Sequence, residues 1–179
     1  MNKKLREIVI AGILTAFSIL IAATFPKLPL PQPFTLTLGS HVPTMIAMFI
    51  SPLVTVFTVI GSIIGFWIAT GNPIVMLRAA SHIIFAVVGM YMLKKNANIF
   101  LVIIVTLILH ATAELALVYF LTGILTPDAL AKSTITSLSY IAFVGTAVHH
   151  VLDSIVTSPI LFALEKAKLI NTKVFGKNK

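Results

Sequence analysis

Long apolar stretches with few charged residues are the feature that most constrains how this chain can fold. Six such stretches follow one another, at residues 8–24, 38–50, 53–69, 74–93, 99–121 and 138–164. A bilayer core about 30 Å thick takes roughly 20 apolar residues for each helical crossing, and the stretch at 38–50 is the shortest of the six. We therefore expect an all-α membrane protein, a bundle of six transmembrane helices that forms a single integral membrane domain over residues 1–179.

The composition excludes a soluble globular fold. The 179 residues are 58% hydrophobic and 10% charged, with a mean hydropathy of +1.06, whereas a soluble domain is about 45–50% apolar and about 25% charged. The absence of cysteine excludes disulfides and thiolate metal sites. No G-x-x-x-x-G-K-[ST] loop occurs and the length leaves no room for a nucleotide-hydrolysing domain, so active transport would need energy from another chain.

The basic residues predict the orientation in the membrane, because Lys and Arg near helix ends are retained on the cytoplasmic side. With six crossings, two basic residues lie on the side opposite the termini, Lys27 and Lys132. Ten lie on the side of the termini: Lys3, Lys4, Arg6, Lys94, Lys95, Lys166, Lys168, Lys173, Lys177 and Lys179. We therefore expect a multi-pass protein of a bacterial plasma membrane with both termini in the cytoplasm. The net charge of +8 is then explained by topology and by anionic lipid, without nucleic acid.

Ionisable side chains inside the apolar stretches are candidates for a binding site, because such groups are costly in hydrocarbon and usually face a bundle interior or a watery cavity. Arg78 and His82 are four residues apart and share a helix face, as do His110 and Glu114. Most of these groups fall in the outer half of the expected membrane, which predicts an outward-facing pocket. The predicted substrate-binding residues are Phe34, His41, Arg78, His82, His110, Glu114, Tyr140 and His149.

The same residues also allow a purely structural interpretation. Arg78 and Glu114 would then form an ion pair between two helices, and the histidines would hydrogen-bond neighbouring helices together. We favour function for Arg78, because a guanidinium is always charged and matches a carboxylate or a ring acceptor. His150, turned by about 100° from His149, and Asp153, deeper than the expected pocket, are assigned to helix packing.

Metal binding and catalysis are not expected. Neither the segment at 110–114 nor the one at 149–153 carries the H-E-x-x-H pattern of zinc proteases, although imidazole and carboxylate ligands suit a divalent ion. No nucleophile–base constellation and no G-x-S-x-G elbow occurs. We therefore predict a protein that is not an enzyme and has neither a resident metal nor a cofactor.

Small residues four positions apart let neighbouring helices approach closely. The pairs of this kind are Gly12 with Ala16, Ala11 with Thr15, and Gly61 with Gly65. We expect the pair in the third apolar stretch, Gly61 and Gly65, to serve internal packing.

Several of these features together resemble the substrate-binding S components of energy-coupling factor (ECF) transporters. They are the basic start, the small residues of the first helix, the proline-rich segment at 25–37, the run LGSHVPTMIAMFISP at 38–52, the glycines of the third helix and the run RAASH at 78–82. The resemblance covers nearly the whole chain in helix number, length and topology. It implies a six-helix membrane protein that captures a vitamin or related micronutrient from outside with high affinity.

The resemblance also implies partners. S components assemble with a transmembrane scaffold subunit and two ATPases, and they are thought to topple in the membrane to release their cargo inside. The family's first helix commonly carries Ala-x-x-x-Ala where it meets the scaffold. The corresponding partner-contact residues here are Ala11, Gly12, Thr15 and Ala16, and the segment at 25–37 is similar to the family's gating loop.

The identity of the vitamin stays open at this point. The residues around His41 are most similar to those of S components assigned to small nitrogen heterocycles, namely nicotinate, pyridoxine or the hydroxymethylpyrimidine precursor of thiamin. The imidazoles, Arg78 and Glu114 offer donors and acceptors to such a ring, and Phe34 or Phe85 can stack on it. Pantothenate is the alternative, because Arg78 can hold its carboxylate. A structural membrane protein without a ligand is the rival from another class.

Overall fold

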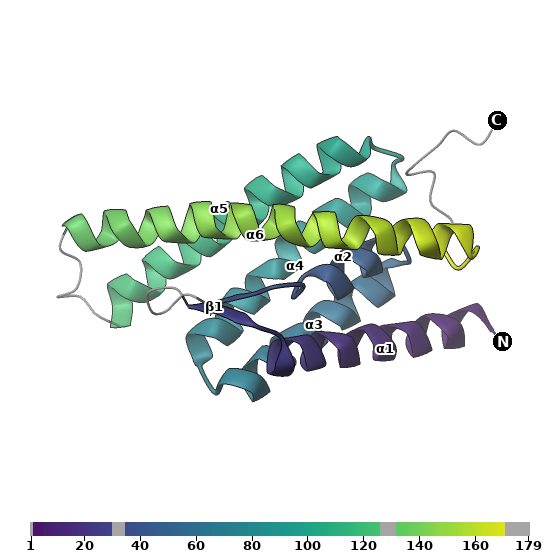
Figure 1. Cartoon of the computed structure of the whole chain (residues 1–179), viewed down its shortest axis with the longest axis horizontal. Coiled ribbons are helices and arrows are strands. Elements are labelled where there is room, and N and C mark those ends of the chain that lie inside the picture. The colour runs from purple at the N-terminus through teal and green to yellow at the C-terminus, as the bar shows by residue number, and fades with distance from the viewer. Residues whose placement is uncertain (1, 30–34, 126–131, 171–179) are drawn as a thin grey trace.

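The computed structural model describes residues 2–29, 35–125 and 132–170. The helices are α1 (Lys3–Thr24), α2 (Val42–Met48), α3 (Pro52–Thr70), α4 (Pro73–Lys94), α5 (Ile99–Leu125) and α6 (Lys132–Lys166). Two short strands, β1 (Lys27–Pro29) and β2 (Thr35–Thr37), pair antiparallel beside the helices (Figure 1). The described part of the chain is thus an almost entirely helical bundle, in agreement with the expected all-α class.

Helices α3 and α4 begin and end at residues whose chemistry sets a boundary. Ser51 and Asn72 cap the two helices, because their side chains accept hydrogen bonds from backbone N–H groups of the first turn. Pro52 and Pro73 follow in the first turn, where a missing N–H costs nothing. Gly71 ends α3 with a φ of +60°, a left-handed conformation that glycine adopts without strain. The expected boundaries of both helices are therefore correct to within one residue.

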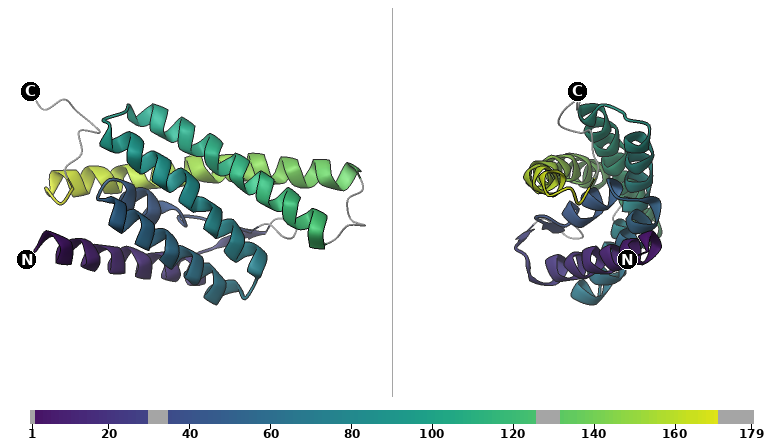
Figure 2. Two further views of the ribbon diagram at one scale, coloured as in Figure 1. Left: turned by 180° about the vertical axis from the view of Figure 1, so that it is seen from behind. Right: turned by 90° about the vertical axis from the view of Figure 1, so that its right-hand side faces the viewer.

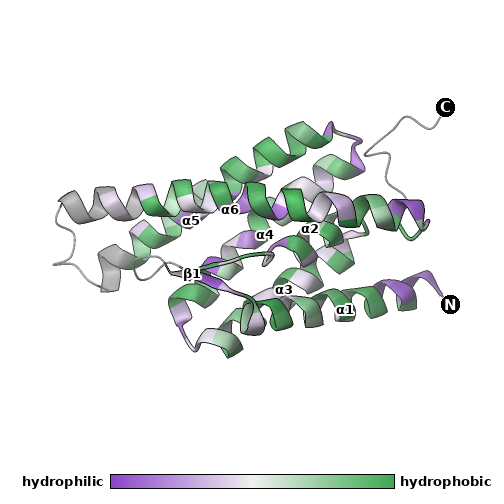
Figure 3. Ribbon diagram, in the orientation of Figure 1, coloured by the Kyte–Doolittle hydropathy of each residue, from purple (hydrophilic) through white to green (hydrophobic). Residues whose placement is uncertain are grey.

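Five helices in the described part of the chain are long and apolar enough to cross a membrane. They are α1, α3, α4, residues Ile99–Leu121 of α5 and residues Tyr140–Lys166 of α6. Hydrophobic residues predominate along these helices (Figure 3). Large apolar side chains lie on their surface, and Phe57, Ile104 and Phe162 are each more than half exposed. Lipid accommodates an apolar surface of this extent, whereas water does not. The chain is therefore a multi-pass membrane protein.

The second passage through the bundle departs from the expected full-length helix. Helix α2 has seven residues, although the apolar stretch runs from 38 to 50, and seven residues span only about 10 Å. The turn before it contains Gly39, whose φ of +81° is incompatible with a right-handed helix. The helix can begin only after this turn, and Pro43 occupies its first turn. Strand β2, a turn and α2 together replace one of the six predicted spanning helices.

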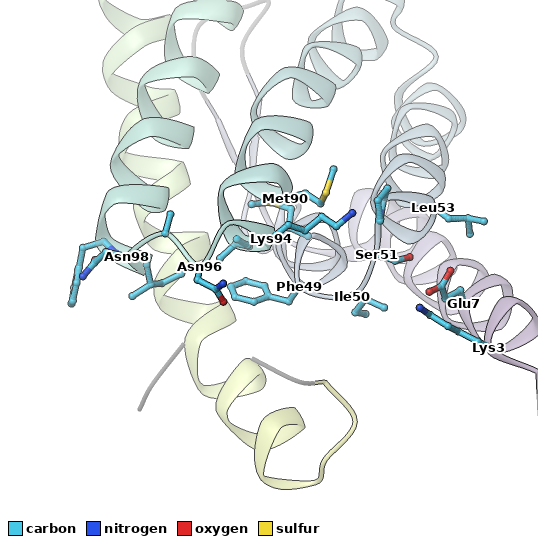
Figure 4. A pocket seen from close by; sticks show the side chains of 16 residues that line it. Lys3, Glu7, Phe49, Ile50, Ser51, Leu53, Met90, Lys94, Asn96 and Asn98 are labelled. Carbon is cyan, nitrogen blue, oxygen red and sulfur yellow. The ribbon is translucent and has the colours of Figure 1, made fainter. Parts of the chain in front are cut away.

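The first residues of α1 and the last residues of α6 lie at the same end of the bundle (Figure 2). Arg6 Nη2 donates a hydrogen bond of 2.8 Å to the Leu169 carbonyl and joins these two segments. The same end holds a cavity of about 1080 Å³ between the start of α1, the α2–α3 junction and the α4–α5 turn. Lys3, Lys94 and Asn96 are among the side chains that line it (Figure 4). After α6 the chain has thus returned to the end from which it started.

Helices α1 and α3 pack closely through the two predicted glycines. A Cβ atom added to Gly61 would collide with the side chain of Thr15, and one added to Gly65 would lie 2.9 Å from the Ile19 Cα atom. The glycine pair therefore serves internal packing, as expected. Thr15 of α1, which lies beside Gly61, also donates a hydrogen bond of 3.3 Å from its hydroxyl to the Phe57 carbonyl of α3.

Candidate functional site

Eight ionisable side chains meet inside the bundle, and we call them the polar cluster. Its members are His41, Arg78, His82, His110, Glu114, His149, His150 and Asp153, all of them buried. They come from the turn before α2 and from helices α4, α5 and α6. Apolar side chains surround the cluster, so each charged member needs a partner inside the protein.

Arg78 and Glu114 form an ion pair between α4 and α5. Arg78 Nε and Nη2 lie 3.1 and 2.7 Å from the same carboxylate oxygen, Oε2 of Glu114. The Thr146 hydroxyl of α6 donates a third hydrogen bond of 2.9 Å to that oxygen. The structure therefore contains the ion pair that the structural interpretation of the sequence predicts. The Glu114 carboxylate of α5 links α4 and α6 through this pair and the Thr146 bond.

Asp153 holds the segment before α2 against α6. Its two carboxylate oxygens accept hydrogen bonds from the backbone N–H of Gly39 at 2.7 Å and of His41 at 2.9 Å. Oδ2 also lies 2.9 Å from His41 Nδ1 and 3.1 Å from His149 Nε2. His149 Nε2 is in addition 3.0 Å from the Thr37 carbonyl of β2. Asp153 thus positions the start of α2, and its neighbour His149 contacts the end of β2.

The imidazole rings contact each other in the middle of the cluster. His41 Nε2 and His82 Nε2 are 3.3 Å apart, and His110 Nδ1 and His150 Nδ1 are 3.1 Å apart. His150 Nε2 lies 3.1 Å from the Thr106 hydroxyl of α5, so His150 joins α5 to α6 as the packing assignment predicts. The fully buried Phe85 ring lies against this group, with its centroid 4.7 Å from that of His110.

A small pocket opens beside the cluster. It is lined by Thr37, Ser40, His41, Phe66, Val75, Arg78, Ala79, His82, Glu114 and His149. Its volume is about 30 Å³, which is space for roughly two water molecules. An aromatic vitamin is larger, so the lining must move before such a ligand can enter.

The structure brings most, but not all, of the predicted substrate-binding residues together. His41, Arg78, His82, Glu114 and His149 line the pocket, and His110 lies directly behind them. Tyr140 is 69% exposed on the surface of α6 and does not join the cluster. Phe34 lies outside the described residues.

The expected packing role of Asp153 agrees with its hydrogen bonds to the segment before α2, and the structure adds contacts with two pocket histidines. The expected depth of Asp153 follows from its position along the last apolar stretch alone and does not predict these partners. The turn at Gly39 carries His41 into the bundle, where its ring reaches Asp153. The spacing of Asp153 four residues after His149 was the available signal, because it places both on one helix face.

The predicted partner-contact residues divide between two faces of α1. Gly12 and Ala16 are exposed, and a Cβ atom added to Gly12 would meet nothing within 4 Å. Ala11 is buried and Thr15 is half-buried against α3. Of these four predicted residues, Gly12 and Ala16 are therefore the two that are accessible to another chain.

The described residues form a membrane bundle with a buried polar cluster and a small adjoining pocket, a combination that makes this region the candidate binding site. The chain is similar to the niacin transporter NiaX of Lactococcus lactis subsp. cremoris (strain MG1363), with 45% identity over 92 residues. The match covers 51% of this chain and 41% of the length of the relative. No family model and no solved structure matches. The similarity confirms that the chain is related to a vitamin transporter, and it supports the resemblance to S components.

Proposed function

We propose that this chain is the substrate-binding S component of an ECF-type importer and that it captures nicotinate or a closely related nitrogen heterocycle. The observation that carries the proposal is the similarity to a named niacin transporter, combined with a buried pocket in which Arg78 lies beside three histidines. Pyridoxine, hydroxymethylpyrimidine and pantothenate remain the other candidate ligands.

The chemistry of the pocket suits a small aromatic carboxylate. Arg78 supplies a permanent positive charge, which matches a carboxylate through two parallel hydrogen bonds. Imidazoles offer both a donor and an acceptor nitrogen, so His41, His82 and His149 can bond a ring nitrogen of the ligand. Phe66 adds an aromatic surface to the same lining.

Entry of the ligand needs displacement of the segment that covers the pocket. Thr37, Ser40 and His41 form one wall, and hydrogen bonds to His149 and Asp153 fix this wall to α6. These few polar contacts can break and re-form more readily than a packed helix interface can separate. The segment from β2 to α2 is therefore the part of the lining that moves in our proposal.

The proposed assembly places both termini in the cytoplasm. The end of the bundle with the start of α1, the α4–α5 turn and the end of α6 would then face the cytoplasm, and the pocket would open outward. Gly12 and Ala16 on the exposed face of α1 would contact the transmembrane scaffold, which two ATPases drive. The chain itself would bind its ligand without catalysing a reaction.

Mass spectrometry of the small molecules that the purified chain carries out of the membrane tests this proposal. The full chain, extracted in mild detergent, is expected to retain nicotinate or one of the other named vitamins in a near-equimolar amount. A matched preparation of the Arg78→Ala variant serves as the control and is expected to carry much less. A wild-type sample without any bound vitamin, prepared from cells grown in nicotinate, would contradict the proposal.

A further inference from the structure

Three histidines from three different elements gather at one point of the polar cluster. His41 precedes α2, His82 lies on α4 and His110 lies on α5. The centroids of their rings are 4.5, 4.6 and 4.8 Å apart. One nitrogen of each ring lies within 4.8 Å of a nitrogen of the other two. Segments far apart in the sequence thus present three metal-ligand atoms to a single small volume.

His110 Nε2 provides a second, independent observation. The His110 ring is 1% exposed, and Nε2 has no hydrogen-bond partner among the described residues. The other ring nitrogen, Nδ1, already lies 3.1 Å from His150 Nδ1. A buried polar atom without a partner is unfavourable, and a cation among the three imidazoles would supply that partner.

The distances suit a four-coordinate ion. Zinc bonds histidine nitrogen at about 2.0–2.1 Å in tetrahedral sites, which places neighbouring ligand atoms about 3.3 Å apart. His41 Nε2 and His82 Nε2 have this separation, 3.3 Å. Glu114 Oε1 lies 3.6 Å from both His82 Nε2 and His110 Nε2. A carboxylate oxygen is therefore in place to complete a set of three imidazoles and one carboxylate.

The groups behind these ligand atoms orient them. His41 Nδ1 lies 2.9 Å from Asp153 Oδ2, and histidines that bind metals usually donate their second N–H to a carboxylate in this way. Arg78 and Thr146 bond to Oε2 of Glu114, so the other oxygen, Oε1, faces the imidazoles. These contacts fix which nitrogen and which oxygen are presented to the centre.

The two carboxylates of the cluster also attract a cation, and a divalent ion would change the cluster's net charge from one negative to one positive. Glu114 and Asp153 are two carboxylates, whereas Arg78 is the one permanently positive member of the cluster. Histidines bind metals as neutral imidazoles, so they add no charge in that state. One negative charge is then uncompensated in a membrane interior, where such a charge is costly.

We propose that His41, His82 and His110 form a binding site for a divalent transition ion of the zinc type, with Oε1 of Glu114 as a fourth ligand. Imidazole suits zinc, copper, iron and nickel, whereas magnesium and calcium prefer sites made of oxygen alone. The proposal goes beyond vitamin binding and does not depend on which vitamin the pocket takes. It assigns the unpartnered nitrogen of His110 a role that vitamin binding leaves open.

Titration of the chelator-stripped full chain with metal tests the proposal. The protein carries an affinity tag without histidine and is titrated with ZnCl2 by calorimetry and with CoCl2 by visible absorption. The expected result is one ion per chain and the intense absorption of four-coordinate cobalt. A wild-type chain that binds no zinc, or cobalt that shows the weak spectrum of a six-coordinate aqueous ion, would overturn the proposal without any variant.

Glutamine substitutions locate the site. His82→Gln and His110→Gln are expected to weaken zinc binding by about 100-fold or more. Loss of a residue that only hydrogen-bonds to a metal ligand typically costs roughly 10–100-fold in metal affinity. The matched comparison is His149→Gln, because His149 belongs to a second possible set of ligands with His41 and Asp153. In our proposal His149 only contacts the carboxylate that orients His41, so its loss should weaken zinc binding by no more than about 10-fold. Unchanged zinc affinity in folded His110→Gln, or a loss in His149→Gln as large as in His110→Gln, would contradict the assignment.

Nicotinate binding to the same stripped wild-type protein is measured in parallel. Zinc binding without nicotinate binding would support the metal site and count against the proposed vitamin. Nicotinate binding without zinc binding would overturn the metal site and leave the proposed function standing. The two proposals therefore fail separately.

Discussion

At the scale of single residues, the Arg78–Glu114 ion pair has two distinct effects that can be measured apart. The pair is buried between α4 and α5, so each charge depends on the other for compensation. Removing one member of a buried pair typically costs about 3–5 kcal/mol, because the remaining charge is left without a partner. Arg78 also lines the pocket, so its guanidinium can contact a ligand carboxylate in our proposal while it stays paired with Glu114.

A double-mutant cycle separates these effects. We expect Arg78→Ala and Glu114→Gln each to lower the thermal stability, and the double variant to recover part of the loss because no unpaired charge remains. Nicotinate affinity should stay low in the double variant, because the ligand carboxylate loses its cation at a cost of about 2–5 kcal/mol. This loss corresponds to roughly thirty-fold to several thousand-fold in Kd. Full nicotinate affinity in the double variant would show that Arg78 serves only the ion pair.

The sequence predicts which polar residues enter the bundle better than it predicts their partners. Charge inside an apolar stretch correctly indicates that Arg78, Glu114 and the four predicted histidines are buried near one another. Tyr140 is different, because a tyrosine is stable on either face of a membrane helix and carries no signal of direction. The packing role expected for Asp153 agrees with the structure, but its contact with His41 depends on a turn that periodicity does not reveal.

At the scale of secondary-structure elements, α1 presents small residues on two faces with different surroundings. The face with Ala11 and Thr15 packs on α3, whereas Gly12 and Ala16 are exposed. Lipid-facing positions of a helix tolerate a larger side chain, but a packed glycine does not. The two faces therefore predict opposite results for the same kind of substitution.

Leucine substitutions at Gly61 and Gly12 form a matched pair for this test. Gly61→Leu should lower the stability of the isolated chain by about 1–3 kcal/mol or prevent folding, because the new side chain collides with Thr15. Gly12→Leu should leave thermal stability and ligand affinity unchanged but weaken co-purification with the scaffold subunit. Normal assembly and uptake by Gly12→Leu would move the partner contact to another face of the chain.

The helix boundaries are predictable where the sequence carries a capping residue followed by proline. Ser51-Pro52 and Asn72-Pro73 mark the starts of α3 and α4, and both predicted starts lie within one residue of the structure. The stretch at 38–50 contains no Asp, Glu, Lys or Arg, so hydropathy alone does not distinguish a full helix from a turn followed by seven helical residues. The positive φ of Gly39 makes that difference, and glycine alone is too common in membrane helices to predict it.

At the scale of the whole molecule, the described residues begin and end on one side of the bundle. The hydrogen bond from Arg6 to Leu169 joins the two segments, and the α4–α5 turn lies at the same end. Basic residues gather at this end, so the positive-inside rule predicts that it faces the cytoplasm. The short strands lie toward the opposite end, so Lys27 of β1 is expected to face the outside.

Cysteine labelling in intact cells checks this orientation, and the chain has no native cysteine to interfere. Lys27 and Lys95 are both exposed and lie at opposite ends of the bundle. Lys27→Cys should react with a membrane-impermeant maleimide from outside, whereas Lys95→Cys should react only after the cells are permeabilised. Labelling of Lys95→Cys in intact cells would reverse the orientation and place the pocket on the wrong side for capture.

Equilibrium binding of nicotinate tests most directly our proposal that the isolated chain is a vitamin receptor. The purified chain in detergent, without ATP or partner subunits, is titrated by calorimetry with nicotinate and, as the matched uncharged control, with nicotinamide. We expect one bound nicotinate per chain and much weaker binding of nicotinamide, because only nicotinate has a carboxylate for Arg78. Absence of binding for nicotinate, pyridoxine, hydroxymethylpyrimidine and pantothenate alike, in a folded preparation, would contradict it.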